Sequence, residues 1–463
     1  MYKQKEKRFR KQATFSETGN WKKNKTQSRE VQIIMKEYKE IQVALLGLGT
    51  VGLGVYKVLQ MQKEEMQHKI GTEIKIKKIL VRNLEKAAGK IEDASVLTNN
   101  WQEIVNDDKI QIVIEVMGGM EPARTYIMEA MQAGKQVVTA NKDLIAADGK
   151  ELMDQAKKSG CDLLFEAAVA GAIPIIRPLK QCLAGNHLSE IMGIVNGTTN
   201  YILTKMFEDG MDFTEALAKA TELGYAEADP TADVEGLDAG RKMAIMATSA
   251  FHSQVKFSDV YTEGITKITA ADVNYAKEMG NVIKLIGIAR NTSNGIEAGV
   301  YPMMIDKKHP LATVRDSFNA VFVHGDAVGD TMFYGRGAGE LPTASAVVGD
   351  VMDVTRNIVW NCTGRIGWSA YKELPIKEFA DVKNRFFIRM QVSNEPGVLA
   401  AIAKVFGDHK VSIERVIQEQ AKAAKAELVI GTSAVKEYHL QDALEELKEM
   451  PIVSEISSII REY

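Results

Sequence analysis

The feature that most constrains this chain is a glycine motif, Gly47-x-Gly49-x-x-Gly52, which stands between two periodic segments. Residues 41–46 are an apolar run of strand formers, and residues 53–61 have the apolar spacing of a helix. In this context the first glycine permits a tight turn, the second lets the backbone approach a pyrophosphate, and the third allows close packing. The motif therefore predicts a dinucleotide site at the helix N-terminus, with a merely tight turn as the alternative.

Strands and helices alternate after this motif. Alternation at this spacing predicts a parallel sheet with helical crossovers, and we place this Rossmann-type domain at 39–170. The strands are expected at 74–82, 110–116, 136–139 and 162–165, with helices at 122–133 and 149–158.

Two further units follow. Residues 171–345 are expected to form an α+β domain for catalysis and dimerisation, with helices at 214–223 and 239–251. Residues 346–383 are expected to form a returning helix, whose pattern spans 344–359, and a linker. Residues 384–463 have the element order βαββαβ, which is typical of a ferredoxin-like domain.

The N-terminal 38 residues form a basic extension. Residues 1–34 hold ten Lys or Arg and three Glu without helical or strand periodicity, so we expect them to be disordered. Our preferred interpretation places the natural start near Met35. A targeting peptide and a nucleic-acid-binding arm are the alternatives, although three Glu fit a targeting peptide poorly.

Bulk composition excludes several classes of protein. The net charge of −3 gives the whole chain no strong attraction to nucleic acid or to a membrane. No stretch reaches the roughly 18 continuous apolar residues that a membrane span requires. Three cysteines (Cys161, Cys182 and Cys362) are too few for a disulfide framework, so a cytoplasmic location is expected.

The residues after the second strand bear on the choice of cofactor. An acid there would accept bonds from the ribose and repel a 2′-phosphate. This chain has Arg82 instead, and a guanidinium can pair with a phosphate. The sequence thus favours NADP, with NAD still possible, unless Arg82 is an ordinary solvated charge.

Two segments carry candidate chemistry. Lys142 ends the segment Thr-Ala-Asn-Lys directly after a predicted strand, where ligands bind in parallel sheets. Asp238 and Lys242 are four residues apart and share one helix face, at the end of a loop with five acids in twelve residues. A carboxylate beside a lysine suits a substrate with an amino group and a hydroxyl. Spacing alone, however, favours an ordinary surface salt bridge.

An ordered set of motifs extends this interpretation. Gly-Leu-Gly-Thr-Val-Gly, Thr-Ala-Asn-Lys, Asn196-Gly-Thr-Thr-Asn200, Gly-Tyr-Ala-Glu-Ala-Asp-Pro and Gly-Leu-Asp-Ala-Gly-Arg-Lys occur in this order. From about residue 40 onward the chain resembles the homoserine dehydrogenases, and its last unit resembles an ACT domain. The resemblance implies reversible reduction of L-aspartate 4-semialdehyde to L-homoserine, on the route to threonine, methionine and isoleucine.

The resemblance also implies residue roles. Lys242 would be the proton donor and acceptor, and Lys142 the second active-site lysine, near cofactor and substrate. The acids Glu227, Asp238 and Asp233 would line the substrate pocket. The cofactor-binding positions would be Gly47, Leu48, Gly49, Thr50, Val51, Gly52, Arg82, Lys142, Gly224 and Gly339.

A monovalent cation and an effector are implied in the same way. The Glu166 carboxylate and the carbonyls of Val169, Gly171 and Ile173 would hold Na⁺, since oxygen-only ligands suit a hard cation. From the residues alone, this segment is only a small-residue turn closing a strand.

The ACT-like unit implies feedback inhibition by threonine in a homodimer or homotetramer. Asn394 and Gly397 would contact the effector, and a purely stabilising role for the unit is the alternative. Two other function classes remain open: a different Rossmann enzyme, which in the case of aspartate-semialdehyde dehydrogenase would need an activated cysteine, and an inactive amino-acid sensor.

Overall fold

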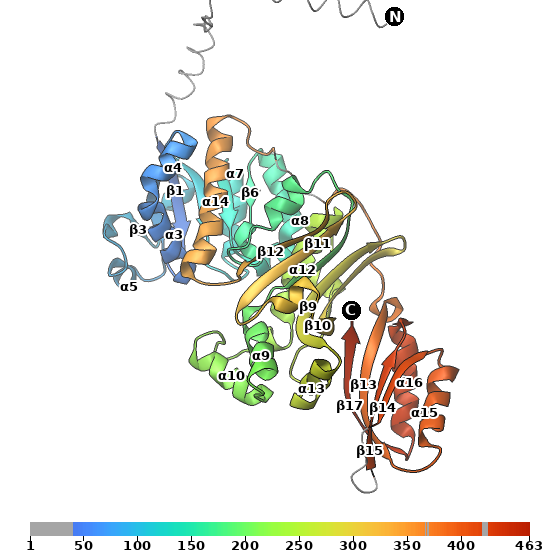
Figure 1. Cartoon of the computed structure of the whole chain (residues 1–463). Helices are drawn as coiled ribbons and strands as arrows, with labels where there is room; N and C mark the ends of the chain where they lie inside the picture. The colour runs from blue at the N-terminus through green and yellow to red at the C-terminus, as the bar shows by residue number, and fades with distance from the viewer. Residues whose placement is uncertain (1–39, 366, 368–369, 419–424) are drawn as a thin grey trace, which may run out of the picture.

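The computed structural model describes residues 40–365, 367, 370–418 and 425–463. The expectations for the basic extension lie outside these residues. Figure 1 shows the parallel-sheet domain and the C-terminal domain at opposite ends of the molecule, with a second sheet between them.

The N-terminal domain is built on a six-stranded sheet of order β3-β2-β1-β4-β5-β6, in which every neighbouring pair is parallel. The strand order reverses between β1 and β4, which is where dinucleotides bind in such sheets. This arrangement confirms the predicted Rossmann-type sheet. The strands are β1 (Glu40–Leu46), β2 (Glu73–Leu80), β3 (Leu97–Thr98), β4 (Ile110–Glu115), β5 (Gln136–Thr139) and β6 (Leu163–Leu164).

Two boundaries differ from the sequence prediction for local reasons. Strand β2 ends at Leu80, because Asn83 caps the next helix by accepting the N–H of Lys86 at 2.9 Å. Helix α8 starts seven residues earlier than expected, because Asn141 caps it in the same way. The helices of this domain are α3 (Thr50–Met61), α4 (Lys63–Ile70), α5 (Leu84–Ala88), α6 (Gln102–Val105), α7 (Ala123–Gln132) and α8 (Lys142–Ser159).

Helix α14 (Glu340–Val359) returns from the second sheet and packs beside α3, as the orange and blue helices in Figure 1 show. Gly54 makes this contact possible, because a Cβ there would lie 2.4 Å from the Glu340 carbonyl oxygen. Val347, Val348, Val351 and Val354 of α14 belong to the same apolar cluster as β1 and α3. The nucleotide domain is therefore completed by a segment about 280 residues away in sequence, as the Lys57–Glu340 ion pair illustrates.

The central region places helices against a mixed sheet. Helix α12 is almost entirely buried, and its methionines share one core cluster with β7 and β9. The strands are β7 (Leu188–Ile194), β8 (Tyr261–Thr262), β9 (Asn281–Thr292), β10 (Gly295–Asp306), β11 (Phe318–Gly325) and β12 (Gly329–Arg336). The helices are α9 (Gly197–Glu208), α10 (Phe213–Glu222), α11 (Thr231–Val234), α12 (Leu237–Phe251) and α13 (Ala270–Glu278).

The C-terminal domain has the predicted βαββαβ order, with a two-residue strand added. Helices α15 and α16 share an apolar cluster with the strands. The elements are β13 (Lys383–Ser393), α15 (Val398–Asp408), β14 (Ile413–Gln418), β15 (Lys425–Thr432), β16 (Val435–Lys436), α16 (Glu437–Glu449) and β17 (Val453–Glu462).

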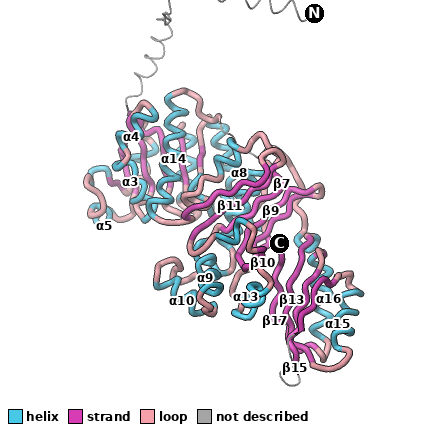
Figure 2. Tube along the Cα trace, in the orientation of Figure 1, coloured by secondary structure: helices cyan, strands magenta, loops and turns pink. Residues whose placement is uncertain are grey.

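The sequence did not indicate that this domain shares its sheet with the central region. Strand β17 pairs in parallel with β10, and Met303 lies opposite Arg461. The result is one eleven-stranded sheet, whose strands form the continuous layer in Figure 2. Because β10 occupies the outer edge of β17, the C-terminal domain continues the sheet of the central region.

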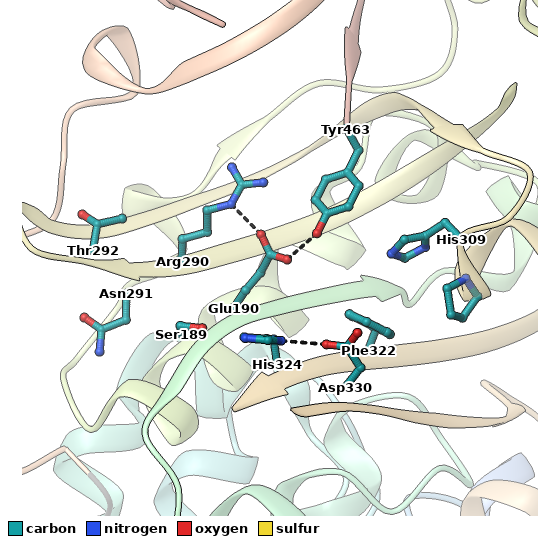
Figure 3. Close-up of a pocket in the computed structure, with 11 residues that line it drawn as sticks. Ser189, Glu190, Arg290, Asn291, Thr292, His309, Phe322, His324, Asp330 and Tyr463 are labelled. Atoms are coloured by element: carbon teal, nitrogen blue, oxygen red, sulfur yellow. Dashed lines mark hydrogen bonds and ion pairs between the residues drawn. The ribbon is translucent and has the colours of Figure 1, made fainter. Parts of the chain in front are cut away.

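The last residue of the chain strengthens this junction. The Tyr463 hydroxyl donates to the Glu190 carboxylate at 2.7 Å, and Arg290 donates to the same carboxylate at 2.6 Å (Figure 3). These side chains line a hollow of about 640 Å³ at the sheet surface. None of the helices in the described part of the chain has the length and apolarity to cross a membrane.

Candidate active site

The glycine turn after β1 has the geometry that a pyrophosphate requires. Gly47 has a φ of +101°, and a Cβ on Gly52 would lie 2.2 Å from the Gly47 carbonyl oxygen. Gly49, in contrast, has no neighbouring atom within 4 Å of an added Cβ. Helix α3 begins at Thr50, and no side chain caps its N-terminus. Its first N–H groups, including those of Val51 and Gly52, therefore remain available to an anion.

The other predicted cofactor positions lie beside the glycine turn after β1 or in turns where a glycine has a positive φ. The Gly47 N–H donates to the Leu80 carbonyl at 2.9 Å, so the end of β2 lies beside the turn, and Arg82 is exposed just beyond it. Leu48 is buried, and its carbonyl accepts a bond from Lys90 at 3.0 Å. Gly224 and Gly339 have φ values of +74° and +125°.

Lys142 is positioned by a network at the ends of two parallel strands. The Thr139 hydroxyl donates to the buried Glu115 carboxylate at 2.6 Å, which ties the end of β5 to the end of β4. The Asn141 side chain then caps α8 and also donates to the Gly119 carbonyl at 2.6 Å. Lys142 is consequently the first residue of α8 and follows the carboxyl end of β5, as the sequence pattern predicted.

The Asp238–Lys242 pair is buried rather than solvated. Lys242 Nζ lies 2.6 Å from Asp238 Oδ2, and the two side chains are only 13% and 11% exposed. Lys142 Nζ lies 3.4 Å from the other carboxylate oxygen. Burial raises the pKa of Asp238, but the two lysines outweigh it, and the pKa of Asp238 is lowered overall. The pair is therefore not the surface salt bridge that spacing alone favoured.

A residue that sequence reasoning did not assign to the site joins two of the acids. Asn196 donates from Nδ2 to Asp233 at 2.6 Å and to Asp238 at 2.9 Å. In the sequence it stood out only as the first residue of the Asn196-Gly-Thr-Thr-Asn200 motif, and the structure shows that it caps α9. Burial raises the pKa of Asp233, and the Asp238 charge adds to this. Within residues 40–365, the exposed Glu227 makes no hydrogen bond or ion pair with these groups.

Comparison with known proteins agrees with this geometry. Residues 174–352 match the homoserine dehydrogenase family, residues 47–166 match the homoserine dehydrogenase NAD binding domain, and residues 386–451 match the ACT domain. The chain is 44% identical over 425 residues to the homoserine dehydrogenase of Bacillus subtilis, covering 91% of this chain and 98% of that protein. The chain belongs to the homoserine dehydrogenase family.

Other homoserine dehydrogenases support this placement. The Corynebacterium glutamicum enzyme is 45% identical over 90% of this chain and 95% of its own. The crystal structure of a homoserine dehydrogenase from Thiobacillus denitrificans matches with a TM-score of 0.87 and 41% identity, covering 92% of this chain and 99% of that one. The activity is therefore the NAD(P)-dependent interconversion of L-aspartate 4-semialdehyde and L-homoserine.

The resemblance to homoserine dehydrogenases placed Na⁺ in the loop at residues 166–173. In the structure, the acid of this loop, Glu166, mainly binds backbone N–H groups. The Glu166 carboxylate accepts the N–H groups of Ile175, Ile176 and Arg177 at 2.5, 2.7 and 2.8 Å. Gly171 has a φ of +56°, and a Cβ there would lie 2.2 Å from the Gly337 carbonyl oxygen. A cation here would share the Glu166 carboxylate with these three N–H donors.

The turn predicted to contact an effector lies at the surface. Gly397 has a φ of +93° and precedes α15, and Asn394 is exposed in the same turn. The first residue of α15, Val398, is buried, and its N–H donates to the Glu395 carbonyl at 3.4 Å. No group of three or more His, Cys, Asp or Glu that could bind a metal occurs in the described ranges.

Proposed function

We propose that Lys242 transfers the proton in the homoserine dehydrogenase reaction. The observation that supports this most directly is its position: Nζ lies 2.6 Å from Asp238 and 2.7 Å from the Val195 carbonyl. These two acceptors use two of the three ammonium hydrogens and leave the third for a substrate oxygen. The nicotinamide supplies hydride when it is bound. The Lys242 ammonium then stabilises negative charge on the aldehyde oxygen and donates a proton to it.

We assign substrate binding to the acids beside this lysine. Asp238 is bonded to Lys242 and faces Lys142, whereas the described residues place no cation within ion-pair distance of Asp233. Asp233 is thus available for the substrate ammonium. Glu227 would complete the site from the exposed loop after α10.

For the cofactor we propose NADP, with NAD as an alternative cofactor that binds the same site. Arg82 is exposed beside the glycine turn, where it can reach a 2′-phosphate. A homoserine dehydrogenase from a hyperthermophilic archaeon, 26% identical with a TM-score of 0.59, has been solved in complex with NADPH. Arg82→Ala should raise the KM for NADPH and leave that for NADH nearly unchanged; an unchanged NADPH preference would remove Arg82 from the site.

We also propose a structural monovalent cation, Na⁺, at the carbonyls of Val169, Gly171 and Ile173, with Glu166 as the charged group. Hydrogen bonds among residues 40–365 leave these three carbonyls without a donor. Replacing NaCl by choline chloride at constant ionic strength should then lower the unfolding temperature. Equal stability in the two salts would contradict this site.

We also propose that threonine inhibits the enzyme by binding at Asn394 and Gly397. The enzyme would assemble as a homodimer or a homotetramer. Because β17 is paired with β10, deletion of residues 384–463 would remove a neighbouring strand from the sheet of the central region. Asn394→Ala and Gly397→Ala are therefore the better variants, and each should raise the threonine concentration needed for half inhibition. Sedimentation velocity measures whether the chain is a homodimer or a homotetramer.

The three unpaired cysteines support a cytoplasmic location.

The central test is an assay with L-aspartate 4-semialdehyde and NADPH or NADH. Lys242→Ala should bind cofactor normally and lose turnover by about 10²- to 10⁴-fold, the usual contribution of a general acid. Near-normal turnover in that variant would overturn the assignment.

A further inference from the structure

The two residues after β7 contact both halves of the catalytic ion pair. The Val195 carbonyl accepts a bond from Lys242 at 2.7 Å, and the adjacent Asn196 donates to Asp238 at 2.9 Å. The same Asn196 nitrogen donates to Asp233 at 2.6 Å. One amide group therefore bridges two neighbouring carboxylates.

The orientation of this amide is set by its other end. Asn196 Oδ1 accepts the backbone N–H and the hydroxyl of Thr199, both at 2.9 Å, and so caps α9. An amide has two N–H donors and one oxygen with two lone pairs, so all its hydrogen-bonding capacity is used. Because the oxygen must face the helix, the NH₂ group must face the acids.

Helix α9 holds this cap in place. One turn further on, Asn200 donates to the carbonyls of Asp316 at 2.8 Å and Phe318 at 3.1 Å. Asn200 also accepts a bond from the buried ammonium of Lys284 at 2.9 Å. The start of α9 is thus anchored independently of Asn196, so a substitution at Asn196 that preserves the cap should leave the backbone in position.

We propose that Asn196 is a positioning residue that holds Asp233 and Asp238 in fixed places, so that Asp238 stays bonded to Lys242 while Asp233 binds the substrate ammonium. This inference rests on the proposed function and gives each of the two acids a separate role. The carboxylates of the half-buried Asp233 and the buried Asp238 repel each other, and the amide opposes that repulsion by donating to both. The charged groups that act on Asp233 are Asp238, which raises its pKa, and Lys242, which lowers it.

Two substitutions separate this role from helix capping. Serine and aspartate are both good N-cap residues, so each should preserve α9. Asn196→Ser loses at least one donor to the acids, and Asn196→Asp loses both and adds a negative charge. The matched control is Asp212→Ser. Asp212 is the exposed N-cap of α10, and its carboxylate accepts the Glu215 N–H at 2.8 Å.

The expected result is a split between kinetic constants. Hydrogen bonds to charged groups are worth about 1.5–3 kcal/mol, so Asn196→Ser should raise the KM for L-homoserine by about 10- to 100-fold. The turnover number should fall by a smaller factor, and NADP affinity should be unchanged. Asp212→Ser should show wild-type kinetics.

The pH profile gives a readout that a purely structural role would not move. In Asn196→Asp, the activity relative to wild type should rise as the pH falls from 8 to 6, because a protonated carboxyl in the cluster regains a donor. A flat ratio, or an unchanged KM in Asn196→Ser, would overturn the inference. If Lys242→Ala is inactive while Asn196→Ser has a normal KM, only this inference fails; if Lys242→Ala is active, the proposed function itself fails.

Discussion

Lys242 Nζ and Asp238 Oδ2 lie 2.6 Å apart on successive turns of α12, with both side chains nearly withdrawn from solvent. A buried pair of this kind differs from an exposed pair at the same spacing, because removal of one partner leaves a desolvated charge. The exposed Lys150–Asp154 pair on α8 has the same i,i+4 spacing and a distance of 2.8 Å, and it offers a matched comparison.

The first prediction uses that comparison. Lys242→Met should abolish most turnover and also destabilise the fold by about 3–5 kcal/mol, since Asp238 would remain buried with one cation fewer. Lys150→Met should change stability by less than about 0.5 kcal/mol. Urea unfolding and steady-state kinetics of both variants check this. Equal effects of the two substitutions would mean that burial does not distinguish the pairs.

The second prediction concerns the glycine turn. Gly49→Ala adds a methyl group into open space and should keep the folded structure while raising the KM for the cofactor, because the pyrophosphate must approach there. Gly52→Ala forces a Cβ against the Gly47 carbonyl and should lower the unfolding temperature. Thermal unfolding and cofactor titration separate the two cases. Normal cofactor affinity in Gly49→Ala would contradict the assigned approach of the pyrophosphate.

The third prediction concerns pH and the buried Lys284. Burial lowers the pKa of Lys284 to about 8 in the folded chain, below the value of about 10.4 in an unfolded chain. The unfolded state therefore binds more protons between these values, and stability should rise as the pH increases from about 8 to about 10.4. Below pH 8 the cost of the buried charge is fully present.

Lys284→Met should remove this rise of stability with pH. Lys307→Met should keep it, because Lys307 is exposed, although it lines the same pocket of about 270 Å³ as Lys284. Unfolding free energies measured from pH 7 to 10.5 give both slopes. Parallel curves for wild type and Lys284→Met would show that Lys284 stays protonated throughout.

The fourth prediction tests the junction between the central region and the ACT domain. Arg461 is buried on β17, donates to Glu437 at 2.7 and 3.0 Å, and donates across the junction to Glu263 at 2.7 Å. Arg461→Leu leaves both carboxylates without this partner and should cost about 3–5 kcal/mol. The control Arg385→Leu removes a half-exposed pair with Glu414 and should cost less than about 1 kcal/mol.

Limited proteolysis gives a second measurement for Arg461→Leu, because loss of β17 from the sheet would expose the chain between the two domains to cleavage. Wild-type stability together with wild-type resistance to proteolysis would show that Arg461 does not hold the domains together.

The sequence by itself determined the elements that depend on local pattern. The parallel strands, the glycine turn at Gly47, the position of Lys142 after a strand and the shared helix face of Asp238 and Lys242 all follow from short-range periodicity and turn chemistry. The βαββαβ order of the C-terminal domain was predictable for the same reason.

Only the tertiary structure decided which of these residues are buried together. It withdrew the Asp238–Lys242 pair from solvent, brought Asn196 to Asp233 and Asp238 across about 40 positions, and engaged Glu166 with backbone N–H groups. It also joined β17 to β10, more than 150 residues apart. Burial and long-range pairing depend on how whole layers pack, and a local sequence pattern carries no information about the partner that a face or an edge will meet.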